Sequence, residues 1–126
     1  MESLNRMSVI VKDNGFGIKN IIINEPKTYN SLSFKTLNIL INIFRRLEND
    51  NKTRVIILSG NGKGFSAGHN LKEVKNLKVR SKYLKLFNLC SKLMLNIVEG
   101  RKPVIAKVHG SAFAAGCQLA ASCDLA

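Results

Sequence analysis

Hydrophobic positions in the first half of the chain change from a strand-like to a helix-like spacing. Two apolar runs, residues 8–13 and 18–25, flank the turn sequence NGFG, a combination that predicts a β-hairpin. The loop EPKTYNSLS follows, and in it Ser31 and Ser33 are candidate helix N-caps. Apolar residues then recur every three or four positions over residues 37–47. This half therefore predicts two strands followed by a helix.

The second half predicts a buried strand, a turn of small residues and a helix, and then the same series again. Residues 54–59 (RVIILS) form an apolar run that is typical of a strand buried on both faces. The segment GNGKGFSAG leads into one long helix, expected over about residues 70–98 and ended by Gly100. We expect a further buried strand at residues 104–108, a helix from about residue 116, and the start of another strand in CDLA.

This order of elements predicts an α/β fold with parallel, buried strands. The length suffices for a substantial core, and the hydrophobic content of 45% is ordinary for a globular protein. Because the last residues begin a new strand, we expect residues 1–126 to be the N-terminal portion of a single domain whose C-terminal half is absent.

Two short segments rich in glycine and alanine lie a few residues after predicted strands. They are FSAGHN (residues 65–70) and FAAGCQ (residues 113–118). Small residues let a ligand approach the backbone, and the first N–H groups of a helix have no intrahelical acceptor. Two such turns facing one point could direct two N–H donors at one oxygen atom, as in an oxyanion hole. Close packing of helix against sheet is the alternative explanation, and the repetition favours a ligand.

The charge of the chain favours an anionic partner. Twenty Lys and Arg residues against eight Asp and Glu give a formal net charge of +12. Part of this charge is concentrated between residues 69 and 92, where a solvated helix face or a phosphate-binding role would explain it. The basic residues there are Lys72, Lys75, Lys78, Arg80, Lys82, Lys85 and Lys92. Few aromatic residues accompany them and no nucleic-acid-binding motif occurs, so we expect no nucleic acid partner.

Metal binding and membrane insertion are not indicated. Three cysteines without a C-x-x-C pattern and two histidines are too few and too poorly spaced for zinc, so we expect no metal. Cys117 and Cys123 are expected to be small core residues. No apolar run approaches the roughly 18 residues of a membrane span, and the N-terminal residues resemble no targeting peptide. We expect a soluble intracellular protein, cytoplasmic or, in a eukaryote, in the mitochondrial matrix.

Other catalytic interpretations are weaker. GFSAG fits the nucleophile elbow G-x-S-x-G, and Ser66, Glu99 and His109 have the chain order of a hydrolase triad. However, GNGK separates Ser66 from its strand, and the chain is short for that fold. The imidazole of His69 could act as a general base, although a histidine in a turn is more often a surface group. GNGKG lacks the spacing of a P-loop.

The blocks GKGFSAGHNLKEV and PVIAKVHGSAFAAGCQLAASCDLA resemble the crotonase superfamily, the enoyl-CoA hydratase/isomerase family. EPKTYNSLS resembles a third segment of that family, so the resemblance covers essentially the whole chain, and AAGCQLAASCDLA is closest to one of its branches. It implies a crotonase-like spiral of repeated β-β-α units, truncated after the N-terminal part of the core. It also implies a role in lipid or fatty acid metabolism and an acyl-CoA thioester as ligand. No separate cofactor is implied, because coenzyme A is part of the substrate.

The resemblance also assigns site residues by position. The backbone N–H groups of His69 and Ala115 fall on the family's two oxyanion donors. Asn70 stands where the family usually has Asp, and Ala115 stands where many relatives have Gly. The positions that match substrate or CoA contacts are Lys27, Thr28, Tyr29, Ala67, Gly68, His69, Asn70, Leu71, Lys72 and Ala115.

Gln118 matches the position of one of the family's two catalytic glutamates. A neutral amide hydrogen-bonds but does not transfer protons near neutral pH, and the second glutamate of the family falls beyond residue 126. We therefore expect ordinary hydratase activity to be weak or lost and the isolated chain to be inactive. Lyase, isomerase or thioesterase chemistry stays open for a complete chain, for which the resemblance implies a homotrimer or hexamer. The alternative is a non-catalytic CoA-binding remnant or assembly partner.

Overall fold

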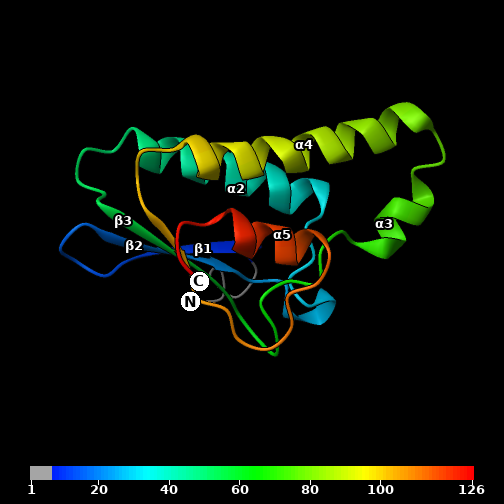
Figure 1. Cartoon of the computed structure of the whole chain (residues 1–126). Coiled ribbons are helices and arrows are strands. Elements are labelled where there is room, and N and C mark those ends of the chain that lie inside the picture. Colours follow the sequence, from blue (N-terminus) through cyan, green and yellow to red (C-terminus); the bar gives the residue numbers. More distant parts are fainter. Residues whose placement is uncertain (1–6) are drawn as a thin grey trace.

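A computed structural model describes residues 7–126, in which two long helices lie over one face of a four-stranded sheet (Figure 1). The strands lie in chain order across the sheet and are β1 (Val9–Asp13), β2 (Ile18–Ile23), β3 (Val55–Gly60) and β4 (Val104–Ala106). β1 is antiparallel to β2, whereas β2, β3 and β4 are parallel to one another. The predicted α/β class with parallel central strands is therefore confirmed.

One or two helices follow each of the strands β2, β3 and β4 along the chain. They are the short 3-10 helix η1 (Pro26–Thr28) and the α-helices α2 (Phe34–Glu48), α3 (Leu71–Asn76), α4 (Arg80–Glu99) and α5 (Ala115–Ser122). α2 and α4 pack side by side, and α5 packs against α4 (Figure 1). Ser33 is the N-cap of α2, since its hydroxyl accepts a hydrogen bond from the N–H of Thr36 at 3.1 Å. The other candidate cap, Ser31, instead donates its hydroxyl to Thr28 Oγ1 at 2.9 Å.

The predicted hairpin is confirmed as well. Val9 pairs with Ile23 at one end of the β1–β2 ladder, and the connecting turn holds Gly15, Phe16 and Gly17 at positive φ. Glycine suits such a backbone because it has no Cβ to clash. At the other end of the chain, Leu125 forms a parallel bridge to Ile105, so CDLA does begin to pair with the sheet.

The prediction of one long helix over residues 70–98 is wrong in one respect, because this segment forms two helices, α3 and α4. Leu77 is only 8% exposed and packs into the core, and Lys78 adopts a left-handed backbone with φ of 58°. Val79 is extended and is the N-cap residue of α4. Gly100 ends α4 as predicted, with an extended backbone.

Burial of the sheet also differs from the prediction. Ile56 and Leu58 of β3 are buried, whereas Val55 and Ile57 between them are only half-buried. Burial alternates because the long helices α2 and α4 lie over one face of the sheet (Figure 1). The expectation of two buried faces is therefore wrong for this strand within the described residues.

The cysteine prediction is wrong for Cys117, which is exposed, and Cys123 is half-buried. Cys117 lies in the first turn of α5, on the side that faces away from the core, whereas Leu119 of the same helix is buried.

Large apolar side chains are also exposed along α4, among them Leu84, Leu95 and Val98.

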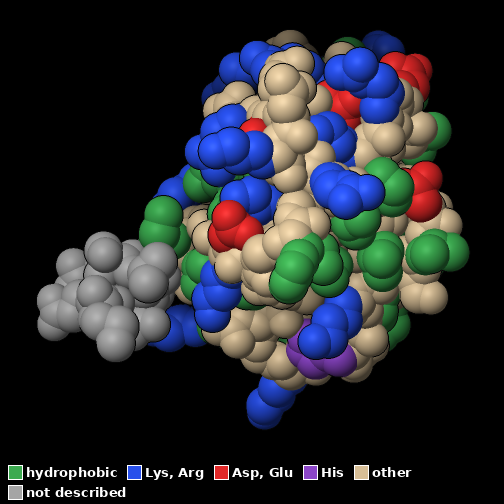
Figure 2. Space-filling model, turned by 90° about the vertical axis from the view of Figure 1, so that its left-hand side faces the viewer, with side chains coloured by type: hydrophobic (Ala, Val, Ile, Leu, Met, Phe, Trp, Pro, Cys, Tyr) green, Lys and Arg blue, Asp and Glu red, His purple; other side chains and the backbone are tan. Residues whose placement is uncertain are grey.

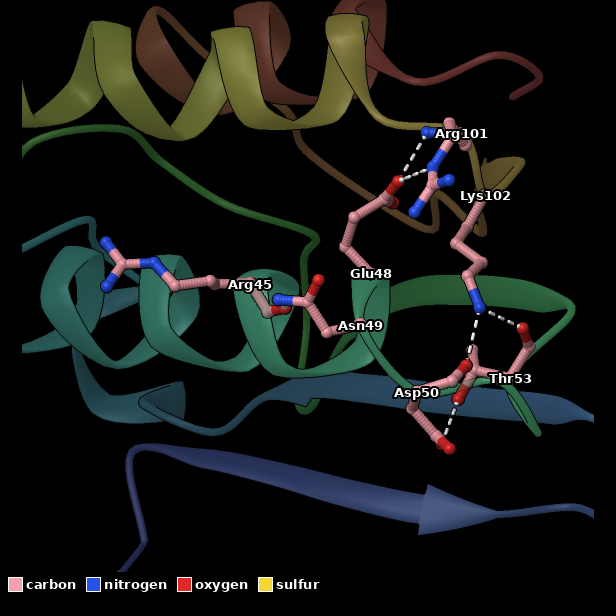
Figure 3. A network of polar contacts seen from close by, with 7 residues as sticks. All are labelled: Arg45, Glu48, Asn49, Asp50, Thr53, Arg101 and Lys102. Atoms are coloured by element: carbon pink, nitrogen blue, oxygen red, sulfur yellow. Dashed lines mark hydrogen bonds and ion pairs between the residues drawn. The ribbon is translucent and has the colours of Figure 1, made fainter.

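A polar network at the C-terminal ends of α2 and α4 fastens both helices to the sheet (Figure 3). Glu48 Oε1 accepts hydrogen bonds from the backbone N–H and the guanidinium Nε of Arg101, at 2.9 and 3.1 Å. The Lys102 ammonium donates to the carbonyl oxygens of Asp50 and Thr53, at 2.6 and 2.5 Å. The loops that enter β3 and β4 are thereby tied together at the end of the sheet opposite the small-residue turns.

Candidate functional site

The first small-residue turn follows β3 and is held by buried hydrogen bonds. Ser66 is 1% exposed; its hydroxyl donates to the carbonyl oxygen of Asn30 at 2.8 Å and accepts from the N–H of Gly68 at 3.2 Å. Gly68 has a φ of 90°, a backbone that favours glycine. The turn is therefore fixed before His69, the first of the two predicted N–H donors.

The second turn follows β4 and leads directly into α5. Ala114 precedes the helix with φ 49° and ψ −122°, an unusual conformation for alanine, and Ala115 is the first helical residue. The start of α5 lies against the first turn, because the N–H of Phe113 donates to the Ser66 carbonyl oxygen at 3.0 Å. A Cβ on Gly116 would overlap that same oxygen. The structure thus brings the two repeated segments into direct contact.

The two predicted donor positions lie close together in this contact. A Cβ placed on Gly68, the residue before His69, would be 3.1 Å from the backbone nitrogen of Ala115. Among residues 7–126, neither the N–H of His69 nor that of Ala115 has a hydrogen-bond acceptor within the chain. Ala115 also begins a helix, where the backbone dipoles favour a negative charge. Both N–H groups are therefore without a hydrogen-bond acceptor among the described residues.

A cavity of about 300 Å³ lies beside these turns. Seven of the predicted contact residues line it, together with Ser31: Lys27, Thr28, Ala67, His69, Asn70, Leu71 and Lys72. Asn70 caps α3 by accepting hydrogen bonds from the N–H groups of Lys72 and Glu73 at 3.0 and 3.2 Å. One wall of the cavity is therefore the loop around η1, and the other is the first turn with the start of α3.

Tyr29, which was also predicted to contact the ligand, lines a second cavity of about 450 Å³. Its other lining residues are Pro26, Lys27, Gly62 and Lys63. Lys27 lines both cavities, so they lie near one another. Sequence reasoning missed four lining residues, Pro26, Ser31, Gly62 and Lys63, although all of them lie inside segments that it had singled out.

Three predicted residues, Gly68, Ala115 and Gln118, line neither cavity. Gln118 is exposed on α5, one turn after Ala115. Ala115 itself is buried, and only its backbone was predicted to act.

The side chain of His69 packs edge-on against Phe87 of α4, with ring centroids 5.4 Å apart and planes inclined by 64°. Its Nδ1 atom is buried and has no hydrogen-bond partner among the described residues. The ring is therefore half-buried rather than the surface group expected of a turn histidine.

The geometry gives the hydrolase alternative no support. The Ser66 hydroxyl is buried and donates to Asn30. His109 lies elsewhere, with Nε2 2.6 Å from the carbonyl oxygen of Gly62. No imidazole of residues 7–126 is hydrogen-bonded to that hydroxyl.

Basic side chains are not restricted to the segment predicted from the sequence. Lys72 lines the first cavity, and the remaining basic residues of that segment are exposed. Lys and Arg also spread over the opposite end of the molecule, at the left of Figure 1, with acidic side chains among them (Figure 2). Within the described residues, no group of His, Cys, Asp and Glu is arranged to hold a metal, and no helix is long and apolar enough to cross a membrane.

The family model of enoyl-CoA hydratase/isomerase matches residues 13–126. The chain belongs to the enoyl-CoA hydratase/isomerase family. Human enoyl-CoA hydratase domain-containing protein 3, a mitochondrial protein by its name, is 44% identical over 110 residues, which are 87% of this chain and 36% of that protein. The branch suggested by AAGCQLAASCDLA is thus represented among the relatives.

Solved structures confirm the crotonase fold of this family member. An enoyl-CoA hydratase from Mycobacterium smegmatis superposes with a TM-score of 0.93 and 41% identity, over 95% of this chain and 47% of that one. Human enoyl-CoA hydratase domain-containing protein 3 superposes with a TM-score of 0.88 and 41% identity, over 94% of this chain and 46% of that one. The chain thus spans less than half the length of these relatives.

Proposed function

We propose that this chain binds an acyl-CoA thioester and polarises its carbonyl group with the backbone N–H groups of His69 and Ala115. The single observation that carries the proposal is the contact between the two turns, which places Gly68 against the Ala115 nitrogen. Two N–H donors on one oxygen stabilise the negative charge that develops there when a proton leaves the carbon beside the thioester. Loss of one such donor costs on the order of a hundredfold in rate in enzymes that rely on it.

The two cavities support coenzyme A as the other part of the ligand. The cavity beside the turns would take the end of the pantetheine arm, and the cavity with Tyr29 and Lys63 would take the nucleotide. Lys27 and Lys63 would face its phosphates, which lysine binds as a compact point charge, and Lys72 would add positive charge beside the first cavity. This use of the positive charge requires no nucleic acid partner.

The same site is poorly equipped for proton transfer. Gln118 is a neutral amide at the position that matches a catalytic glutamate, and it is exposed on α5. We therefore propose ligand binding and carbonyl polarisation without ordinary hydration of an enoyl-CoA. A non-catalytic CoA-binding protein is the second candidate, and Gln118 is the observation that favours it. We also propose the mitochondrial matrix as the location of the protein, and a trimer or hexamer as the assembly of a longer chain.

Calorimetric titration of the purified chain with CoA, and then with crotonyl-CoA, tests the proposal. Both should bind, and crotonyl-CoA should bind more tightly because only the thioester carbonyl meets the two N–H groups. Hydration of crotonyl-CoA, followed by loss of its conjugated absorbance, should stay at the rate without protein. Failure to bind CoA would refute the proposal, and rapid hydration would refute the role assigned to Gln118.

A further inference from the structure

Asn30 lies fully buried where the two walls of the first cavity meet. It is 0% exposed and belongs to the loop that contributes Lys27, Thr28 and Ser31. Its φ is 55°, and that of the preceding Tyr29 is 52°. Asparagine tolerates this left-handed backbone better than most residues do. The conformation alone, however, does not explain why a polar side chain is enclosed here.

The carboxamide of Asn30 is bonded at both ends. Its Oδ1 accepts from the N–H of Glu25 at 2.8 Å, within its own loop. Its Nδ2 donates to the carbonyl oxygens of Asn61 and Gly64, at 2.8 and 2.9 Å, across to the segment that follows β3. Burying an amide is costly unless its hydrogen bonds are made. The side chain therefore clamps one loop onto the other.

Backbone hydrogen bonds on both sides of Asn30 also join its loop to the turn after β3. The N–H of Ala67 donates to the Tyr29 carbonyl oxygen at 2.9 Å, and the N–H of Leu32 donates to the Gly68 carbonyl oxygen at 2.7 Å. Gly68 is the residue directly before His69. A shift of Asn30 would therefore be transmitted to both walls and to the backbone that orients the His69 N–H.

We propose that Asn30 is a positioning residue for this site: its buried carboxamide sets the spacing of the two cavity walls and the direction of the His69 N–H. Asn30 does not line either cavity, so it acts through its neighbours rather than by contact with the ligand. The inference rests on the proposed function for the identity of the ligand, but the mechanical part can be measured without any ligand.

The test compares two substitutions with a matched control. Asn30→Gly removes the carboxamide but accepts the left-handed backbone, and Asn30→Ala adds strain to the same loss. Thr53→Ala is the control, because Thr53 is also buried and its hydroxyl donates to Asp50 at 2.7 Å, but it lies at the opposite end of β3. Each variant of the whole chain is examined by amide hydrogen exchange in NMR and by calorimetric titration with CoA.

Exchange of the Ala67 and Leu32 amides should accelerate by about tenfold or more in Asn30→Gly, whereas that of Ile56 in β3 should change by less than about threefold. CoA affinity should fall by about tenfold in Asn30→Gly and by less than about twofold in Thr53→Ala. Unchanged exchange at Ala67 and Leu32 would overturn the inference, as would unfolding of both Asn30 variants, because the residue would then support the whole fold. If the unmodified chain does not bind CoA, the proposed function fails, and the exchange rates alone decide the positioning role.

Discussion

Gly116 packs directly against the carbonyl group of Ser66, so that the start of α5 touches the turn after β3. This contact joins two segments that lie about fifty residues apart in the chain and that share the pattern of FSAGHN and FAAGCQ. Small residues at both turns are therefore required for packing as well as for access to the backbone. The two explanations considered for these turns are thus compatible.

The Gly116→Ala substitution should destabilise the chain strongly. Its methyl group would overlap the Ser66 oxygen, and the turns would have to separate. We expect a loss of about 2–4 kcal/mol in the free energy of unfolding, measured with denaturant. Gly15→Ala is the control, because a Cβ there meets nothing within 4 Å and costs only the left-handed strain of about 1–2 kcal/mol. Equal losses in the two variants would contradict the contact.

Reversal of charge at Lys72 should weaken CoA binding selectively. Lys72 lines the first cavity, whereas Lys92 is exposed on α4 away from both cavities proposed for the ligand. We expect Lys72→Glu to raise the Kd for CoA by about tenfold or more and Lys92→Glu by less than about threefold at physiological salt. Equal effects would show that the net charge attracts CoA without a defined site.

One thiol should react far faster than the other two in the folded chain. Burial raises the pKa of the Cys123 thiol to about 11, with a further contribution from the neighbouring Asp124 carboxylate, and burial also raises the pKa of Cys90. Cys117 is exposed. Because the thiolate is the reactive form, iodoacetamide at neutral pH should label Cys117 first, as mass spectrometry of peptides would show. Equal labelling of Cys90 under native conditions would contradict its burial.

Acid should weaken the connection between α2 and the loop before β4. Partial burial of the Glu48 carboxylate acts to raise its pKa, but the hydrogen bonds from Arg101 outweigh it, and the pKa lies below its ordinary value of 4.5. A lowered pKa in the folded state stabilises the fold above about pH 4.5, and this contribution is lost as the pH falls through the folded pKa. Denaturant midpoints should therefore fall at acid pH, and less steeply in Glu48→Gln. A Glu48→Gln variant with the same pH profile would show that the interaction adds nothing.

Local patterns were sufficient to predict the hairpin and the strands that precede the small-residue turns, and they narrowed the N-cap of α2 to Ser31 or Ser33. The family resemblance then indicated which of the turn residues would surround one cavity. These features depend on short segments, in which residue type and backbone geometry are closely linked.

The features that could not be predicted depend on contacts between distant segments. The break at Lys78 arises because Leu77 packs into the core, and lysine carries no signal for a left-handed backbone. The side of α5 on which Cys117 lies depends on where the helix begins, at Ala115, and on how it packs against α4. Asn30 stands among polar loop residues in the sequence, and only the approach of the segment after β3 shows that its amide is enclosed.

The most direct test of the proposed site is removal of one backbone donor without removal of the helix that carries it. Ala115→Pro deletes the N–H at the first position of α5, a position that generally accepts proline in helices, whereas Ala115→Gly keeps it. Because Gly68 lies close to the Ala115 nitrogen, circular dichroism first checks that the proline variant is folded. Both variants are titrated with CoA and with acetoacetyl-CoA, whose enolate absorbance reports negative charge on the thioester oxygen. We predict that Ala115→Pro binds CoA with unchanged affinity but loses the enolate signal, while Ala115→Gly keeps both. An undiminished enolate signal in folded Ala115→Pro would contradict the account.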